Sequence, residues 1–247
     1  MPAQQTVLLL GGTGRTGQQV LAHLLHCGIK VRAIVRSVQK LPAGVLENTN
    51  LTVVETDFLA MNSSELHQHL CGCDAVISCL GHVLSLKGIF GAPRDLVTRG
   101  TRVLCHGIEA LQPAKPVKFI LMSSVSVNHP GGLDPRRGVL AKALLWVIRG
   151  VIPPARDNQQ AANFLFDHIG LTSPFVQWTT VRPDTLLGGD VSDYTVHDGL
   201  VNSLFAPGSS TMANIAHFMS ELVTNPKAWN DWKGQLPVVI DATTTSF

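Results

Sequence analysis

The sequence contains few charged residues and no long block of charge of one sign. Asp, Glu, Lys and Arg make up 15% of its 247 residues, and the formal net charge is +2. Proteins that bind nucleic acid through its phosphates carry a basic patch, so this balance gives no reason to expect a nucleic-acid partner. The 45% of hydrophobic residues is typical of a globular chain and excludes a disordered or fibrous protein.

Long hydrophobic runs are also absent. The most apolar stretch, Gly138–Pro154, is interrupted by Lys142 and Arg149 and is shorter than the roughly 20 residues of a membrane-spanning helix. No basic segment precedes an apolar one at the N-terminus, so no targeting signal is expected there. The five cysteines are an odd number, which favours free thiols. We therefore expect a soluble, cytoplasmic protein without a membrane partner.

Apolar runs alternate with helical patterns along the chain. The apolar runs predict strands at Thr6–Leu10, Val31–Val35, Leu51–Glu55, Ala75–Cys79, Val117–Met122, Trp178–Val181 and Val238–Ile240. The helical spacing of apolar residues predicts helices at Arg15–Cys27, Ser63–Leu70, Pro93–Leu111, Ala155–His168 and Asn214–Val223. This alternation predicts an α/β protein with a doubly wound parallel sheet, the Rossmann fold. Without a linker or repeat, residues 1–247 are expected to form one domain, with a small C-terminal substrate lobe from about residue 183.

A glycine-rich segment, Gly11–Gly17, stands between the first predicted strand and the first predicted helix. Gly11 permits a tight turn, Gly14 keeps a Cβ away from a bound pyrophosphate, and Gly17 lets helix and strand approach closely. The helix N-terminus offers unpaired N–H groups to the anion. Further donors are the hydroxyls of Thr13 and Thr16. The segment predicts a dinucleotide site; the alternative is a vestigial loop that no longer binds a nucleotide.

The end of the second predicted strand indicates which dinucleotide is bound. An NAD site has an Asp or Glu there to accept the ribose 2′-hydroxyl, whereas this strand ends in Arg36-Ser37. Arg36 and Arg15 together would clamp a 2′-phosphate, because a guanidinium matches the geometry of a phosphate. The sequence therefore predicts NADP(H), unless both arginines are simply solvated.

An acid and an aromatic residue, Asp57 and Phe58, follow the third predicted strand. Asp57 is placed to meet the edge of the adenine ring, with Phe58 beside it. The alternative is that Asp57 caps a helix or forms a turn.

Five segments together resemble the atypical short-chain dehydrogenase/reductase superfamily: Gly11–Gly17, Asp57-Phe58, Ser78-Cys79-Leu80-Gly81, Met122-Ser123-Ser124 and Val181-Arg182-Pro183. Within it, the chain is similar to NmrA-like and flavin or biliverdin-IXβ reductase-like proteins over about residues 5–185. The resemblance implies that Leu80 and Gly81 pass along the nicotinamide ribose. It also implies that Ser123 lies near the nicotinamide, as the candidate catalytic residue, and that the Pro183 turn closes over the cofactor.

The chain departs from this superfamily in its tyrosines. Familiar members transfer a proton from a Tyr that has a Lys four residues later, but the one tyrosine here, Tyr194, is followed by Thr195-Val196-His197-Asp198. We therefore expect Tyr194 to be a packing residue of the C-terminal lobe. A flavin- or quinone-like acceptor takes hydride on a delocalised ring, so it would tolerate the missing tyrosine.

Four polar residues remain as sources of a proton or a hydrogen bond: His82, Ser123, Ser124 and His129. The alternative is that the serines only cap the end of a strand and that the histidines lie in surface loops. The polar residues that begin the helix predicted at Ala155–His168, including Asp157, are expected to form an exposed first turn.

Three functions stay open. The first is an NADPH-dependent oxidoreductase that reduces a small conjugated or aromatic substrate, and the second is a non-catalytic, NADP(H)-sensing regulatory protein. The third, an NAD-dependent epimerase or dehydratase, is disfavoured by the missing Tyr-x-x-x-Lys motif. No metal site is expected at His67-x-His69-x-Cys71-x-Cys73, because the two histidines would point to opposite sides of a helix. The apolar pattern Leu140–Ile152 predicts a helix that packs in the core, covers the substrate or forms a homodimer contact.

Overall fold

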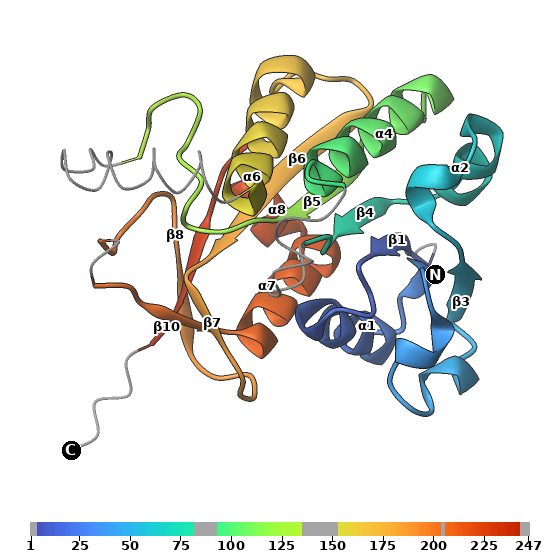
Figure 1. The fold of residues 1–247 in the computed structure, drawn as a ribbon, viewed down its shortest axis with the longest axis horizontal. Helices are drawn as coiled ribbons and strands as arrows, with labels where there is room; N and C mark the ends of the chain where they lie inside the picture. The colour runs from blue at the N-terminus through green and yellow to red at the C-terminus, as the bar shows by residue number, and fades with distance from the viewer. Residues whose placement is uncertain (1–3, 82–92, 135–152, 204–205, 243–247) are drawn as a thin grey trace.

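Eight strands form one sheet in the order β3-β2-β1-β4-β5-β6-β10-β8 (Figure 1). The computed structural model describes residues 4–81, 93–134, 153–203 and 206–242. The strands of this sheet are β1 (Thr6–Leu10), β2 (Lys30–Val35), β3 (Leu51–Glu55), β4 (Ala75–Ser78), β5 (Val117–Met122), β6 (Val176–Pro183), β8 (Tyr194–His197) and β10 (Val238–Asp241).

Neighbouring strands are parallel from β3 to β10, and only the edge strand β8 runs antiparallel to its neighbour. The strand order reverses between β1 and β4, since β2 and β3 follow on one side and β5 and β6 on the other. This is the predicted doubly wound arrangement, and the fold class is confirmed. In such sheets a crevice opens outside the carboxyl ends of the strands where the order reverses.

Helices cover both faces of the sheet (Figure 1). They are α1 (Arg15–His26), α2 (Ser63–Leu70), α4 (Leu96–Leu111), α6 (Pro153–Phe164), α7 (Met212–Thr224) and α8 (Pro226–Trp232). Successive strand residues point to opposite faces, which gives two separate cores. Leu8 and Leu10 of β1 pack with α2, α4 and α6, whereas Val7 and Leu9 pack with α1 and α7.

Several elements have the bounds that the sequence predicts, namely β1, β3, β5 and α2. The start of α2 is fixed by a capping box. The Asn62 side chain accepts the Glu65 N–H at 3.0 Å, and the Glu65 carboxylate accepts the Asn62 N–H at 3.0 Å. Such reciprocal bonds satisfy N–H groups that a helix leaves without an intrahelical partner, so the start of α2 is encoded locally.

The start of α4 is fixed from a distance. Asp157 of α6 accepts the N–H of Val97 at 2.8 Å and that of Thr98 at 2.9 Å, and its side chain is buried. The expectation that Asp157 lies in an exposed first turn is therefore wrong. Its carboxylate is buried because the free N–H groups of α4 replace water as its hydrogen-bond donors.

The residues after Pro183 are partly merged with the main sheet. β8 and β10 extend that sheet, and α7 packs against α1 on one of its faces. Only β7 (Thr185–Leu187) and β9 (Ser209–Thr211) form a separate two-stranded sheet. The predicted C-terminal lobe thus shares its strands with the nucleotide-binding fold, and its role toward a substrate stays a prediction.

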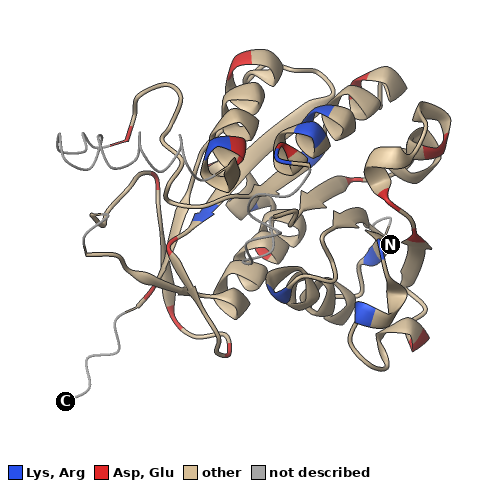
Figure 2. Ribbon diagram, viewed as in Figure 1, with Lys and Arg blue, Asp and Glu red and all other residues tan. Residues whose placement is uncertain are grey.

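Charged residues are spread over many elements (Figure 2). Within residues 4–81, 93–134, 153–203 and 206–242, no helix is long and apolar enough to cross a bilayer. Two expectations, the helix at Leu140–Ile152 and the position of His82, concern residues outside the described part of the chain.

Candidate dinucleotide-binding site

The glycine-rich loop after β1 needs its first glycine for two reasons. Gly11 has φ +76°, which favours glycine, and a Cβ there would lie 2.4 Å from the carbonyl oxygen of Cys79. The Gly14 N–H donates to the Gly11 carbonyl at 2.9 Å and closes the turn. The loop therefore lies tightly against the end of β4, as the sequence predicts for Gly11.

The other two glycines of the motif have different surroundings. A Cβ on Gly17 would lie 2.0 Å from the Gly11 carbonyl oxygen, so helix α1 approaches the loop as closely as predicted. Gly14 is exposed at the start of α1, where a Cβ would meet only the Gly11 oxygen, at 3.2 Å. No other heavy atom that limits a Cβ lies within 4 Å of this position. The first N–H groups of α1 are donors without intrahelical partners. The loop thus fits a bound diphosphate.

A cleft of about 250 Å³ opens at the point where the strand order reverses. It is lined by residues that follow β1, β2, β3 and β4. Those that the sequence predicts as cofactor-binding are Gly11, Thr13, Gly14, Arg36, Asp57, Phe58, Leu80 and Gly81. Segments far apart in the sequence therefore meet here because parallel strands end at one edge of the sheet.

One end of the cleft is basic. Arg36 directly follows β2, and Lys40 lies in the short 3₁₀ turn Val38–Lys40; both are exposed and line the cleft. Arg36 was predicted from the sequence and Lys40 was not, although a second cation four residues later was a usable signal. Arg15 is exposed at the start of α1 and is not among the residues that line the cleft.

The walls beyond the basic end are mostly apolar, and their polar side chains are those of Thr13, Thr56 and Asp57. The Asp57 carboxylate caps the short turn Phe58–Ala60 by accepting the Leu59 N–H at 3.1 Å, and it also lines the cleft. Phe58 also lines the cleft and is buried. Gly100 of α4 lies against two of the lining residues, since a Cβ there would be 2.8 Å from Leu80 and 3.3 Å from Phe58. Gly100 was not predicted from the sequence, because it lies within an uninterrupted helical pattern.

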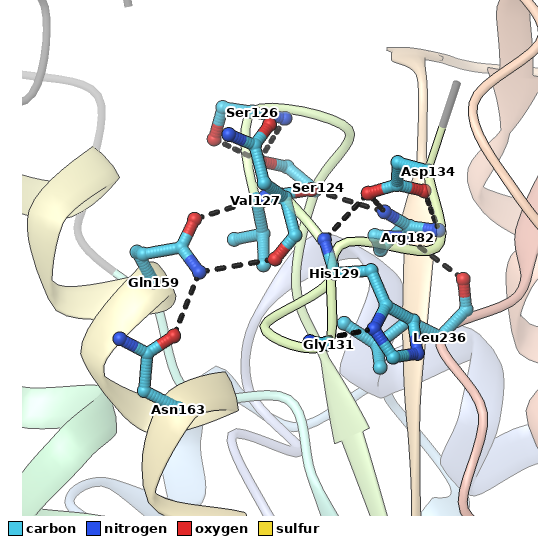
Figure 3. A network of polar contacts seen from close by, with 11 residues as sticks. Ser124, Ser126, Val127, His129, Gly131, Asp134, Gln159, Asn163, Arg182 and Leu236 are labelled. Atoms are coloured by element: carbon cyan, nitrogen blue, oxygen red, sulfur yellow. Dashed lines mark hydrogen bonds and ion pairs between the residues drawn. The ribbon is translucent and has the colours of Figure 1, made fainter. Parts of the chain in front are cut away.

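Farther along the same edge of the sheet, a buried arginine joins three segments (Figure 3). Arg182 of β6 pairs with both oxygens of Asp134, at 2.8 and 2.9 Å, and it is fully buried. It also donates to the carbonyls of Val127, at 3.1 Å, and Leu236, at 2.8 Å. Burial alone would raise the pKa of Asp134, but hydrogen bonds and charge from Arg182 outweigh it and lower that pKa.

The loop after β5 is further held by α6. Gln159 accepts the Asn128 N–H at 2.9 Å and donates to the Asn128 carbonyl at 3.0 Å (Figure 3). His129 is 4% exposed in this loop, so the alternative that it lies in a surface loop is wrong. Its Nδ1 accepts the Gly131 N–H at 3.0 Å, and burial, the largest effect, lowers its pKa. His129 is therefore held as a neutral imidazole.

A comparison with protein families shows which family this chain belongs to. The model of a family described as NAD(P)H-binding matches residues 11–226, from the glycine loop to the first residue of α8. The chain belongs to this NAD(P)H-binding family.

Two curated relatives are similar over most of this chain. It is 27% identical over 230 residues to protein TIC 62, chloroplastic, of Pisum sativum, and 26% identical over 220 residues to that of Arabidopsis thaliana. The matches cover 77% and 78% of this chain but 38% and 32% of the relatives. The chain thus spans about a third of the length of these relatives.

Solved structures show the same fold at lower identity. A short-chain dehydrogenase/reductase from Veillonella parvula in complex with NADP has a TM-score of 0.66 and 15% identity, covering 98% of this chain and 97% of that one. ChuY, an anaerobilin reductase from Escherichia coli O157:H7, has a TM-score of 0.67 and 18% identity, covering 98% and 100%. At identities of 15% and 18%, these similarities show that this chain and the two solved proteins have the same fold.

Four further residues predicted to bind the cofactor of this NAD(P)H-binding protein are not among those lining the cleft: Thr16, Gly17, Ser123 and Pro183. Thr16 and Gly17 are buried in the first turn of α1. Ser123 and Pro183 lie at the ends of β5 and β6, on the carboxyl edge that also carries the cleft. The Pro183 carbonyl accepts the Val125 N–H at 3.0 Å. Closure of the Pro183 turn over the cofactor stays a prediction.

The two adjacent serines after β5 differ. The Ser124 hydroxyl lies 2.6 Å from that of Ser126 and accepts the Ser126 N–H, so it stabilises the turn. The Ser123 side chain is 6% exposed, and its hydroxyl has no hydrogen-bond partner among the described residues. A buried hydroxyl without a partner is costly, so Ser123 is a candidate to bind a group that enters from outside the chain.

The one tyrosine of this family member is engaged elsewhere. Tyr194 of β8 forms a 2.7 Å hydrogen bond between its hydroxyl and Nδ1 of His217 in α7. Burial, followed by the nearby Glu221, raises the pKa of Tyr194 to about 12. It is not among the residues that line the cleft.

Proposed function

We propose that this protein is an NADPH-dependent oxidoreductase that transfers hydride to a small conjugated or aromatic acceptor, such as a flavin or quinone. One observation carries the preference for NADPH: Arg36 and Lys40 line the cleft at the end of β2, where an acid would serve NAD. Two cations beside the ribose supply charge-assisted hydrogen bonds to a 2′-phosphate. With the ribose hydroxyl of NADH they have no anion to pair with.

The remaining cleft residues suit the rest of the adenosine and the diphosphate. Exposed Gly14 and the N–H groups at the start of α1 would bind the diphosphate without interference from a Cβ. Phe58 offers an apolar surface to the adenine, and Leu80 and Gly81 line the path from the diphosphate toward β5. When bound, the reduced nicotinamide supplies the hydride, and the chain orients it.

The carboxyl ends of β5 and β6 would receive the reacting half of the cofactor and the acceptor. Ser123 would donate a hydrogen bond there, because its buried hydroxyl has no partner among the described residues. Tyr194 would have no part in proton transfer, since its hydroxyl is bonded to His217 and its pKa is raised to about 12. A delocalised acceptor ring that collects its proton from water fits this lack of a tyrosine acid.

The NADPH preference is tested by titrating the protein with NADPH and NADH by calorimetry. Each charge-assisted hydrogen bond contributes about 1.5–3 kcal/mol, so NADPH should bind roughly 10- to 100-fold more tightly. Arg36→Ala should remove most of this difference and leave NADH binding nearly unchanged. Equal affinities in the unmodified protein, or equal losses for both nucleotides in Arg36→Ala, would refute the assignment.

A second candidate is a non-catalytic NADP(H)-sensing protein, which the engagement of Tyr194 with His217 favours. Both candidates bind NADPH, so turnover separates them. An oxidoreductase oxidises NADPH steadily with one or more members of a flavin and quinone panel, whereas a sensor binds NADPH without consuming it.

A further inference from the structure

Gln18 of α1 joins the two anion-binding ends of the cleft. Its Nε2 donates to the carbonyl of Lys40 at 2.9 Å and to the carbonyl of Thr13 at 3.3 Å. Thr13 belongs to the glycine-rich loop at the diphosphate end, and Lys40 to the turn at the basic end. One amide group thus bonds to both segments.

Both ends of the basic turn are held by packing as well as by hydrogen bonds. Val38 packs against the core cluster that contains α1, and Leu41, directly after the turn, is buried in it. Glu55 of β3 accepts the Val38 N–H at 3.1 Å. Lys40 itself is exposed, and the bond from Gln18 ties its carbonyl to α1. Without Gln18, the Lys40 carbonyl loses this hydrogen bond.

We propose that Gln18 is a positioning residue that sets the preference for a 2′-phosphate by holding Lys40 against the glycine-rich loop. The proposal rests on the proposed function, in which Lys40 and Arg36 bind that phosphate. A preorganised cation costs less to order on binding, so the phosphate gains more from it. The same bond makes the two ends cooperate, since ordering of one end by its phosphate also orders the other.

The test uses Gln18→Met, which keeps the length of the side chain and removes its donor, and Gln19→Met as a matched control on the same helix. Like Gln18, Gln19 is half-buried and is not among the residues that line the cleft. Calorimetric ligands are NADPH, NADH, adenosine 2′,5′-bisphosphate and AMP. For Gln18→Met we expect a threefold to tenfold loss of affinity for NADPH and the bisphosphate, the range of one hydrogen bond. We expect less than a twofold change for NADH and AMP, and no change in any affinity for Gln19→Met.

A double variant separates positioning from general loosening of α1. In Lys40→Ala the side chain that Gln18 positions is gone, so adding Gln18→Met should lower the NADPH:NADH affinity ratio by less than twofold. An equal loss for all four ligands in Gln18→Met, or an undiminished loss of the ratio in the Lys40→Ala background, would overturn the proposal.

The outcomes also distinguish this proposal from the one on which it rests. If the unmodified protein prefers NADPH and Gln18→Met retains the full preference, only the role of Gln18 is refuted. If the unmodified protein binds NADPH and NADH equally, both proposals fall together.

Discussion

The cleft beside β1 and the polar network beside β6 lie along one edge of the same sheet, but they hold their polar groups in different ways. At the cleft, the loop is shaped by glycine backbone, and the cations Arg36 and Lys40 are exposed. Beside β6, Arg182 and Asp134 are buried and bonded to each other. The cleft thus leaves its donors free for a ligand, whereas the network uses its donors to fix the chain.

The largest expected effect would come from breaking the buried pair. Arg182→Met would leave the 8%-exposed carboxylate of Asp134 without its bidentate partner, and such losses cost about 3–5 kcal/mol of the free energy of unfolding. Urea denaturation measures this cost. The double variant Arg182→Met/Asp134→Leu should recover part of it, because no charge is then left buried. If the free energy of unfolding of Arg182→Met lies within 1 kcal/mol of that of the unmodified protein, the pair does not fix the chain and the contrast between the two regions fails.

At the cleft, two glycine substitutions should separate binding from folding. Gly14→Ala should weaken NADPH binding at least tenfold, because its Cβ would project toward the proposed position of the diphosphate, and should change the free energy of unfolding by less than about 1 kcal/mol. Gly17→Ala should lower both the affinity for NADPH and the free energy of unfolding, since its Cβ would lie 2.0 Å from the Gly11 oxygen. Calorimetry and urea denaturation without nucleotide give the two quantities. Unchanged NADPH affinity in Gly14→Ala would mean that the diphosphate is bound elsewhere.

A smaller effect, dependent on pH, is expected from His129. Burial lowers its pKa, an effect opposed by Asp134 and reinforced by Arg182, so the unfolded chain takes up a proton more readily than the folded one. The stabilisation is complete above the unfolded pKa of about 6.5 and is lost as the pH falls below it, by at most about 1.4 kcal/mol per pH unit.

The matched variant is His129→Asn, which keeps an acceptor for the Gly131 N–H and removes the titration. Its free energy of unfolding should fall less steeply than that of the unmodified protein between pH 7 and 5. Parallel curves would show that His129 is not held neutral.

The smallest effect is expected at Tyr194. Tyr194→Phe should leave the rate of NADPH oxidation within about twofold, because the hydroxyl is bonded to His217 rather than exposed in the cleft. A loss of a hundredfold or more, the usual contribution of a general acid, would identify Tyr194 as the proton donor. The reaction would then take place beside the C-terminal residues and not at the ends of β5 and β6.

The sequence predicted the cleft better than it predicted the polar network. Glycine motifs and strand ends are local signals, so the sheet, α2 and the loop from Gly11 to Gly17 could be placed from neighbouring residues alone. Lys40 was missed because it lies in a 3₁₀ turn with no periodic pattern, and its position depends on Gln18 and Glu55 from other elements.

The errors at His129 and Asp157 have a common physical cause. Both residues are polar and stand in segments with loop or helix-start composition, so exposure was the natural expectation. Each is buried because its partner groups come from elsewhere: the amides of α4 for Asp157, and the ring of Phe166, 5.4 Å away, for His129. Partners that are remote in sequence leave no local pattern.

The cap that Asp157 provides to α4 also bears on the order of folding. Two amides in the first turn of α4 bond to a carboxylate 59 and 60 residues later in the chain, so that turn is completed only when α6 docks. Helix formation in α4 is thus coupled to a long loop closure, which slows assembly of this face of the sheet. In native-state hydrogen exchange, the Val97 and Thr98 amides would report the opening of α6 rather than the fraying of their own helix.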